Sequence, residues 1–201
     1  ISNVRKADKM PQFLPRSATM QSKIMMFIDG ENLAIRYAAL LAGKSPESHV
    51  VYEPDVYVWS KYASRLTDPH EYIRRYYYTS IAGDENKRIS IEQALRSAGI
   101  ESPRVFRKEK GKRSKRVDIM LATEMLSHAH RKNYDIAVLV VGDEDYVPLV
   151  ECVKSEGARV ALWFVNNGLS DALLRSSDHF YDLGDILFRN ENEPAFKMIY
   201  A

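Results

Sequence analysis

The chain has 201 residues, enough for one hydrophobic core of full size, and its hydrophobic fraction of 45% is ordinary for a globular protein. No stretch approaches the roughly 18 apolar residues of a membrane span, and no signal-peptide pattern opens the sequence, so neither a membrane protein nor an exported protein is expected. The 29 basic and 27 acidic residues nearly cancel, so the net charge of +2 does not indicate a partner.

The chain contains a single cysteine, Cys152, which is followed by Val153 in an apolar stretch. One cysteine cannot form an intrachain disulfide, and we expect it to be a buried small hydrophobic residue. A reducing, cytoplasmic location fits this composition.

The hydrophobic pattern predicts strands and helices that alternate along the chain. Residues 1–22 carry two prolines and no apolar period, and we expect an extended N-terminal arm. In chain order there follow a strand at 24–28, a helix at 33–41, a loop at 43–54, a second helix at 56–66, a strand at 72–81, a helix at 89–98, a strand at 104–107, a helix at 117–129, a strand at 136–141, a helix at 146–156, a strand at 160–165, a short helix at 172–176 and an edge strand at 180–183. Residues 189–201 are expected to form a C-terminal tail.

Alternating strands and helices are typical of parallel βαβ units. The runs at 24–28, 136–141 and 160–165 are apolar at every position, as expected of strands that helices cover on both faces. We therefore predict one α/β domain over residues 23–188, with a three-layer α/β/α architecture and a mostly parallel open sheet of the Rossmann-like kind.

Acidic side chains follow two of the apolar strands. Asp29 comes directly after the run at 24–28, and Asp143 and Asp145 follow the run at 136–141. Ligands of open parallel sheets bind beyond the carboxyl ends of the strands, so these carboxylates are expected at the edge where a ligand would lie.

Asp118 is expected to join this group from a helix. It falls at helical spacing with Leu121, Ala122 and Met125, so we expect its carboxylate to lie on the apolar stripe near the start of the helix. An unpaired charge there is costly, and a divalent cation shared with the strand-end aspartates would offset that cost. Oxygen ligands of this kind suit Mg²⁺ or Mn²⁺. Taken singly, each acid is also typical of a helix cap, a turn or a helix dipole contact, and the spacing does not decide between the two interpretations.

Three segments carry a resemblance to a known family. Phe27-Ile28-Asp29-Gly30-Glu31-Asn32-Leu33 resembles the opening motif of NYN domains, which belong with the PIN-like nucleases. Lys115-Arg116-Val117-Asp118 is similar to the family's Lys-x-Val-Asp helix start, and the segment 142–149 is similar to its Gly-Asp-x-Asp-Phe-x-Pro-Leu signature. Residues 169–180 are similar to the closing segment, so the resemblance extends over about residues 24–184.

The resemblance implies a Mg²⁺- or Mn²⁺-dependent endoribonuclease that hydrolyses RNA. It implies an acidic, metal-binding site made of Asp29, Asp118, Asp143 and Asp145, with Asn32 as the polar neighbour. Val141 stands where the family often has Ser or Thr. The alternative is therefore an RNA-binding or scaffolding NYN module with little or no cleavage, and a small-molecule phosphohydrolase could use the same acids. Formation of a homo-oligomer is left open.

A basic segment leads into Asp118. Residues 104–116 hold eight Lys and Arg residues against one acid, and six of them are candidates for RNA contact: Lys108, Lys110, Lys112, Arg113, Lys115 and Arg116. Cations at the rim of an acidic site suit a phosphate backbone, although such a run is also typical of a solvated loop. Tyr76 to Tyr78 could stack unpaired bases, which favours single-stranded RNA, yet three tyrosines in a central strand are more typical of a core.

Overall fold

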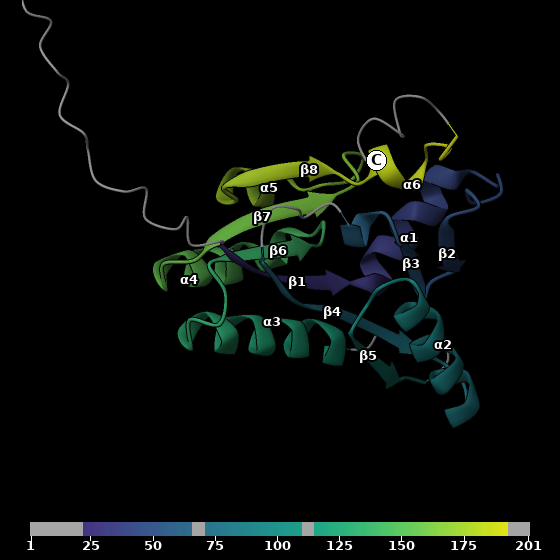
Figure 1. Ribbon diagram of the computed structural model, residues 1–201, viewed down its shortest axis with the longest axis horizontal. Coiled ribbons are helices and arrows are strands. Elements are labelled where there is room, and N and C mark those ends of the chain that lie inside the picture. Colours follow the sequence, from purple (N-terminus) through teal and green to yellow (C-terminus); the bar gives the residue numbers. More distant parts are fainter. Residues whose placement is uncertain (1–21, 66–70, 110–114, 193–201) are drawn as a thin grey trace, which may run out of the picture.

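Six strands form one sheet in which all neighbouring strands run parallel. The computed structural model describes residues 22–65, 71–109 and 115–192, and within them the sheet has the order β5-β4-β1-β6-β7-β8 (Figure 1). The strands are β1 (Lys23–Asp29), β4 (Glu71–Ile81), β5 (Ser102–Arg107), β6 (Ile136–Val140), β7 (Arg159–Phe164) and β8 (His179–Asp182). The chain first builds outward from β1 through β4 to β5 and then restarts at β6 on the other side of β1. This is the arrangement of a doubly wound fold, and it confirms the predicted fold class.

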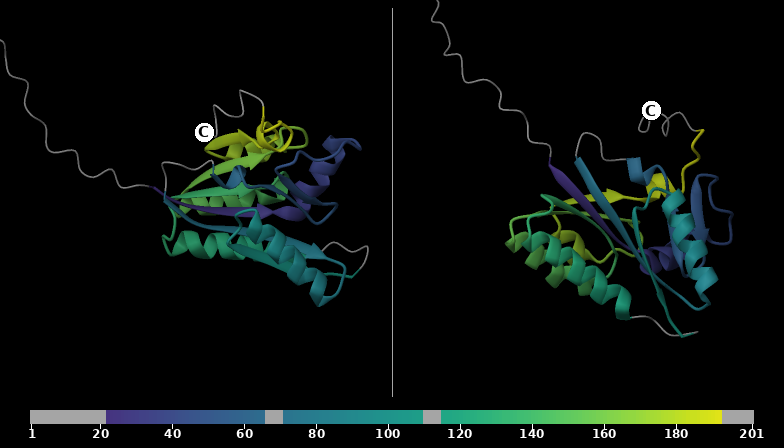
Figure 2. Two further views of the ribbon diagram at one scale, coloured as in Figure 1. Left: turned by 45° about the vertical axis from the view of Figure 1, so that its right-hand side comes forward. Right: turned by 60° about the horizontal axis from the view of Figure 1, so that its bottom comes forward.

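Helices cover both faces of this sheet (Figure 2). One face carries α1 (Gly30–Leu41), α2 (Glu85–Ser97) and α6 (Gly184–Leu187), and the other carries α3 (Lys115–His130), α4 (Val147–Ser155) and α5 (Asp171–Ser176). Two short 3₁₀ helices, η1 (Ala63–Arg65) and η2 (Glu144–Tyr146), complete the described helices. No helix in the described ranges is long and apolar enough to cross a bilayer.

The central position of β1, between β4 and β6, explains why its sequence is apolar throughout. Met26 and Ile28 belong to the hydrophobic cluster beneath α1 and α2, whereas Met25 and Phe27 belong to the cluster beneath α3 and α4. Successive side chains of a strand point to opposite faces, so a strand covered on both sides needs apolar residues at every position. The continuous apolar runs predicted as strands therefore lie where a two-faced core requires them.

The helix predicted at 56–66 is wrong, and so is the loop assigned to all of 43–54. Strands β2 (Val50–Glu53) and β3 (Tyr57–Ser60) pair there as an antiparallel hairpin, followed by η1. Tyr77 on the sheet fixes the hairpin, because its hydroxyl donates to the Val58 carbonyl and accepts from the Val58 N–H, both at 3.0 Å. Val58 and Trp59 are fully buried. The β-branched and aromatic residues of β3 favour a strand, and this packing against the sheet holds the strand in place.

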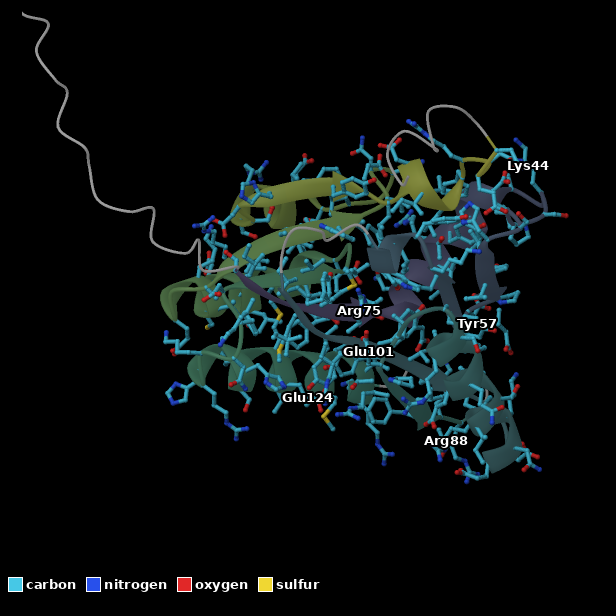
Figure 3. All side chains as sticks on the ribbon, in the orientation of Figure 1. Lys44, Tyr57, Arg75, Arg88, Glu101 and Glu124 are labelled. Atoms are coloured by element: carbon cyan, nitrogen blue, oxygen red, sulfur yellow. The ribbon has the colours of Figure 1, made fainter. Side chains whose placement is uncertain are left out.

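The three tyrosines of β4 are core residues. Tyr76, Tyr77 and Tyr78 are all at most 4% exposed, so none of them offers a face to a nucleobase. The hydroxyl of Tyr78 donates to Oε2 of Glu124 on α3 at 2.6 Å (Figure 3 labels Glu124). The core interpretation of this segment is confirmed.

Cys152 is exposed, so its predicted burial is wrong. Helix α4 buries Val150 and Val153, and residue 152 falls on the outward side of that helix. The apolar neighbours that suggested burial lie on the other face of the same turn.

The first residues of the predicted C-terminal tail contact the hairpin region. The Glu191 carboxylate accepts from the Tyr62 hydroxyl at 2.6 Å and from the Ser48 hydroxyl at 2.9 Å. The side chain of His49 lies 3.0 Å from the carbonyl of Arg189. Residues 189–192 therefore lie against the body of the domain, while residues 193–201 and most of the predicted arm lie outside the described residues.

Candidate active site

A cavity of about 440 Å³ opens where β1 and β6 end side by side. Five acidic residues line it, together with an amide, a cation and several apolar side chains: Asp29, Glu31, Asn32, Ile35, Arg36, Val117, Asp118, Ile119, Ala122, Asp143, Asp145, Tyr146, Leu149 and Gly168. The strand order reverses between β1 and β6, and such a switch point is the usual ligand position of doubly wound sheets. The structure thus brings Asp29, Asn32, Asp118, Asp143 and Asp145 together around one cavity.

Asp29 is the buried carboxyl group of this cavity. It ends β1 and caps α1, since its Oδ1 accepts from the backbone N–H of Asn32 at 3.0 Å. The side chain is only 5% exposed. Burial, with a further contribution from the charge of Asp118, raises the pKa of Asp29 to about 7, although hydrogen bonds from Asn32 and Tyr146 act in the opposite direction.

The residue after Asp29 has to be small. A Cβ atom on Gly30 would lie 1.9 Å from Cε1 of Tyr77, the same ring whose hydroxyl holds the hairpin. Glycine therefore lets α1 begin directly against the sheet, which places Asp29 and Asn32 at the cavity.

Tyr146 links two of the acids. Its hydroxyl oxygen lies 3.1 Å from Oδ2 of Asp29 and 3.2 Å from Oδ1 of Asp118. Burial raises the pKa of the Tyr146 phenol above its usual range, so the hydroxyl keeps its one hydrogen and can donate to only one carboxylate at a time. Asp29 and Asp118 therefore share one hydrogen-bond donor. Sequence reasoning missed this residue, and the signal was a Tyr where the family signature has Phe.

Asp118 differs from the prediction in its burial. The buried stripe of α3 consists of Val117, Leu121, Met125 and Ala129, while Asp118 itself is exposed and faces the cavity from the first turn. The cost of an unpaired buried charge, which motivated its prediction as a ligand, therefore applies to Asp29 instead.

Asp143 and Asp145 follow β6 and are both exposed. Oδ2 of Asp143 accepts from Nδ2 of Asn32 at 2.8 Å, so the first helix after β1 orients a carboxylate that follows β6. Asp145 lies within η2, one residue before Tyr146. The two motifs that meet here are 111 residues apart in the chain.

The NYN domain family matches residues 23–184 of the chain. The chain belongs to the NYN domain family. NYN domains are a PIN-like nuclease family. No curated protein shows a significant match to the sequence. Among solved structures, a protein of unknown function from Vibrio parahaemolyticus, VPA0982, superposes with a TM-score of 0.64 at 20% identity, covering 85% of this chain and 98% of the other. That likeness shows a shared fold.

The side chains that line the cavity carry oxygen atoms that suit a divalent cation, but they do not converge on one point. Within the described ranges, no three His, Cys, Asp or Glu side chains lie close enough together to hold a metal ion. The cavity nevertheless presents carboxylate oxygens and the Asn32 amide, which are ligands that Mg²⁺ and Mn²⁺ prefer. A cation would also stabilise the ionised form of the buried Asp29 beside Asp118. Asp143 and Asp145 are exposed and have room to turn toward it.

The predicted RNA-contacting cations divide into three groups. Lys110, Lys112 and Arg113 lie outside the described residues. Lys115 and Arg116 are exposed at the start of α3, directly before Val117 and Asp118. Lys108 instead forms an ion pair with Glu31, its Nζ lying 2.6 Å from Oε1, and both side chains are at most 15% exposed.

Val141 is fully buried in the cluster beneath α3 and α4 and does not line the cavity. The residue that departs from the family pattern therefore packs in the core of this domain. The absence of a Ser or Thr hydroxyl at this position therefore removes no polar group from the described wall of the cavity.

Proposed function

We propose that this NYN domain is a Mg²⁺- or Mn²⁺-dependent endoribonuclease whose site consists of Asp29, Asp118, Asp143 and Asp145, with Asn32 orienting Asp143. The observation that carries the proposal is the buried carboxyl of Asp29, which shares the Tyr146 hydroxyl with Asp118 at the switch point of the sheet. A desolvated carboxyl with a perturbed pKa and a charged neighbour in a cavity is typical of a functional site.

The cavity lining favours water as the nucleophile. Among the described residues that line it there is no Ser, Thr, Cys or His. A divalent cation, when bound, would lower the pKa of a water molecule and neutralise charge at the phosphate. The four aspartates would hold that cation. The Asn32 amide would keep one carboxylate oxygen of Asp143 in place, and Tyr146 would do the same for Asp29 and Asp118.

RNA is the favoured substrate because cations lie beside the acids. Lys115 and Arg116 are exposed one helical turn or less from Asp118, where they would attract a phosphate backbone. A small phosphorylated molecule would fit within the cavity and would not need this flanking charge.

An RNA cleavage assay tests the proposal. A single-stranded RNA labelled at one end should give internal cleavage products with Mn²⁺ or Mg²⁺ and none with EDTA. Asp143→Asn should remove the activity, because the amide cannot replace a charged ligand. Asp171→Asn, an exposed acid in the first turn of α5, should cleave like the wild type. Equal metal-dependent cleavage by wild type and Asp143→Asn would overturn the assignment of the site.

A second function, RNA binding without cleavage, is favoured by one observation. The described acids do not form a preformed metal cluster. In that case RNA would bind with the same affinity in EDTA and in Mn²⁺, and no metal would give internal products.

A further inference from the structure

One cation lies inside the acidic cavity and is not paired with any acid among the described residues. Arg36 follows Asn32 by one turn of α1, so both line the cavity from the same face of that helix. Five acidic residues line the same cavity, yet Arg36 forms no ion pair or side-chain hydrogen bond within the described part of the chain. Arg75, Arg88, Arg104 and Arg189, by contrast, all pair with carboxylates.

Gly168 provides the space that Arg36 occupies. A Cβ atom on Gly168 would lie 2.1 Å from Cζ of Arg36 and 2.3 Å from its Nε, so the guanidinium lies directly against the glycine backbone. Gly168 also has φ of +94°, which disfavours other residues. The loop after β7 thus leaves room for a guanidinium whose five N–H donors are not used by the acids around it.

One wall of the cavity also carries apolar side chains that are exposed to solvent. Ile119 is 64% exposed, the highest value among the large hydrophobic side chains of the described residues, and it lies beside Asp118. Ile35 is 38% exposed and precedes Arg36. A metal ion or a bare phosphate would not cover these side chains, whereas a planar base would bury them.

We propose that the cavity binds one unpaired nucleotide, with its phosphate on Arg36 and its base against Ile119 and Ile35. An Arg guanidinium matches the oxygen geometry of a phosphate, and a base can reach the apolar wall only when it is not paired in a duplex. The volume of about 440 Å³ lies in the range of small-ligand sites. The inference rests on the proposed function for its ligand class, but it requires binding only and no cleavage.

A binding experiment separates the two contacts. The probe is a fluorescein-labelled, single-stranded six-nucleotide RNA in EDTA, so that no metal-dependent cleavage occurs. Arg36→Gln should lower the affinity roughly five- to tenfold and make the plot of log affinity against log salt shallower by about 0.7. Ile119→Ser should lower the affinity to a similar degree without changing the slope, because it removes apolar surface and no charge.

Two matched controls belong to this experiment. Arg159→Gln removes an exposed cation from the start of β7, at the opposite end of the sheet. Leu126→Ser removes an exposed apolar residue from the same helix as Ile119, outside the cavity. If Arg36→Gln and Ile119→Ser bind the RNA like these controls, the proposal is overturned. It is also overturned if Ile119→Ser weakens binding of the same sequence as a duplex just as strongly.

Gly168→Ala tests the placement of the guanidinium independently. It should displace Arg36 and reproduce the loss of affinity and slope seen in Arg36→Gln. Gly43→Ala is its control, since Gly43 has φ of +81° and a Cβ atom there would have no neighbour within 4 Å, so this variant carries the backbone strain alone. Wild-type RNA binding by a folded Gly168→Ala variant would contradict the placement.

Failure of this inference can be distinguished from failure of the proposed function, because the binding experiment and the cleavage assay give separate results. If the wild type cleaves RNA but the Arg36 and Ile119 variants bind like their controls, this inference fails and the proposed function stands. If no metal supports cleavage but the two variants lose affinity as described, the proposed function fails and the nucleotide site stands.

Discussion

Tyr146 and Asp29 meet across the floor of the cavity, with the hydroxyl oxygen 3.1 Å from Oδ2, although they are 117 residues apart in the chain. The same hydroxyl reaches Asp118 at 3.2 Å. Two carboxyl groups therefore share the Tyr146 hydroxyl. A cation shared by these carboxyl groups would stabilise them in place of the hydroxyl. The contribution of the hydroxyl to stability should therefore depend on metal.

Tyr146→Phe should lower the free energy of unfolding by about 1 kcal/mol in EDTA, because a buried hydrogen-bonded hydroxyl is removed. The loss should shrink in saturating Mg²⁺ or Mn²⁺, which would neutralise both carboxylates directly. Urea unfolding under the two conditions measures the difference. Tyr134→Phe is the control, since its buried hydroxyl donates to the Met125 carbonyl at 2.9 Å away from the acids, and its effect should not change with metal. An equal loss for Tyr146→Phe in EDTA and in metal would contradict this prediction.

Asp29 should make the metal-free protein less stable as pH rises. Its pKa is about 7 in the folded state and 3.8 for an ordinary carboxyl, so between these values the folded protein binds more protons than the unfolded chain. Its contribution to stability is then fully present below about pH 4 and is lost as pH rises through 7. Asp29→Asn removes this titration and keeps an oxygen that can cap α1.

The variant should therefore have a higher Tm than the wild type at pH 8 in EDTA, and the difference should diminish toward pH 5. Asp171→Asn provides the comparison, because Asp171 is exposed in the first turn of α5. Melting curves of wild type and Asp29→Asn that shift in parallel across this pH range would show that Asp29 titrates normally.

Much of the sheet could be predicted because a strand that is buried on both faces is apolar at every position. Met25 and Phe27 enter one core cluster and Met26 and Ile28 the other, so β1 reads as an uninterrupted apolar run. The strands β2 and β3 of the hairpin do not form such a continuous apolar run. Its strands are short, and they are fixed by the hydroxyl of Tyr77, a residue that follows them in the chain and lies on another element.

The positions of Asp29, Asp143 and Asp145 at the cavity could be predicted because they follow parallel strands, which end at a common edge, whereas Asp118 reaches the cavity from α3. The surroundings of Arg36 and Lys108 could not be predicted. Arg36 resembles any helical cation in the sequence, and its place in the cavity against Gly168 is evident from the structure. Lys108 belongs to a basic run, yet in the folded chain it pairs with Glu31, whose carboxylate also accepts from the Ser80 hydroxyl.

Divalent cations should raise the Tm of the wild-type protein. A cation at 100 times its Kd stabilises the folded state by about 2.7 kcal/mol if it binds the folded state alone. Asp29→Asn and Asp143→Asn should each reduce this shift, because each removes one charged ligand, and Asp171→Asn should leave it unchanged. Thermal melts across a Mg²⁺ or Mn²⁺ titration measure it. If Asp29→Asn and Asp143→Asn both keep the wild-type shift, the cations bind elsewhere on the protein.

Lys108, Lys115 and Arg116 should separate into one pair that binds RNA and one residue that stabilises the fold. Lys115→Ala with Arg116→Ala removes two exposed charges and should make the salt dependence of single-stranded RNA binding shallower by about 0.7 for each phosphate that the protein no longer binds. If the protein cleaves RNA, KM should rise while kcat changes little, since these residues bind substrate and transition state alike. Lys108→Ala should leave the salt slope near its wild-type value but lower the Tm, because Glu31 would remain largely buried without its cation. Salt titrations of RNA binding and thermal melts of both variants provide the comparison. A steep loss of salt dependence in Lys108→Ala would show that this lysine leaves Glu31 for the phosphate backbone when RNA binds.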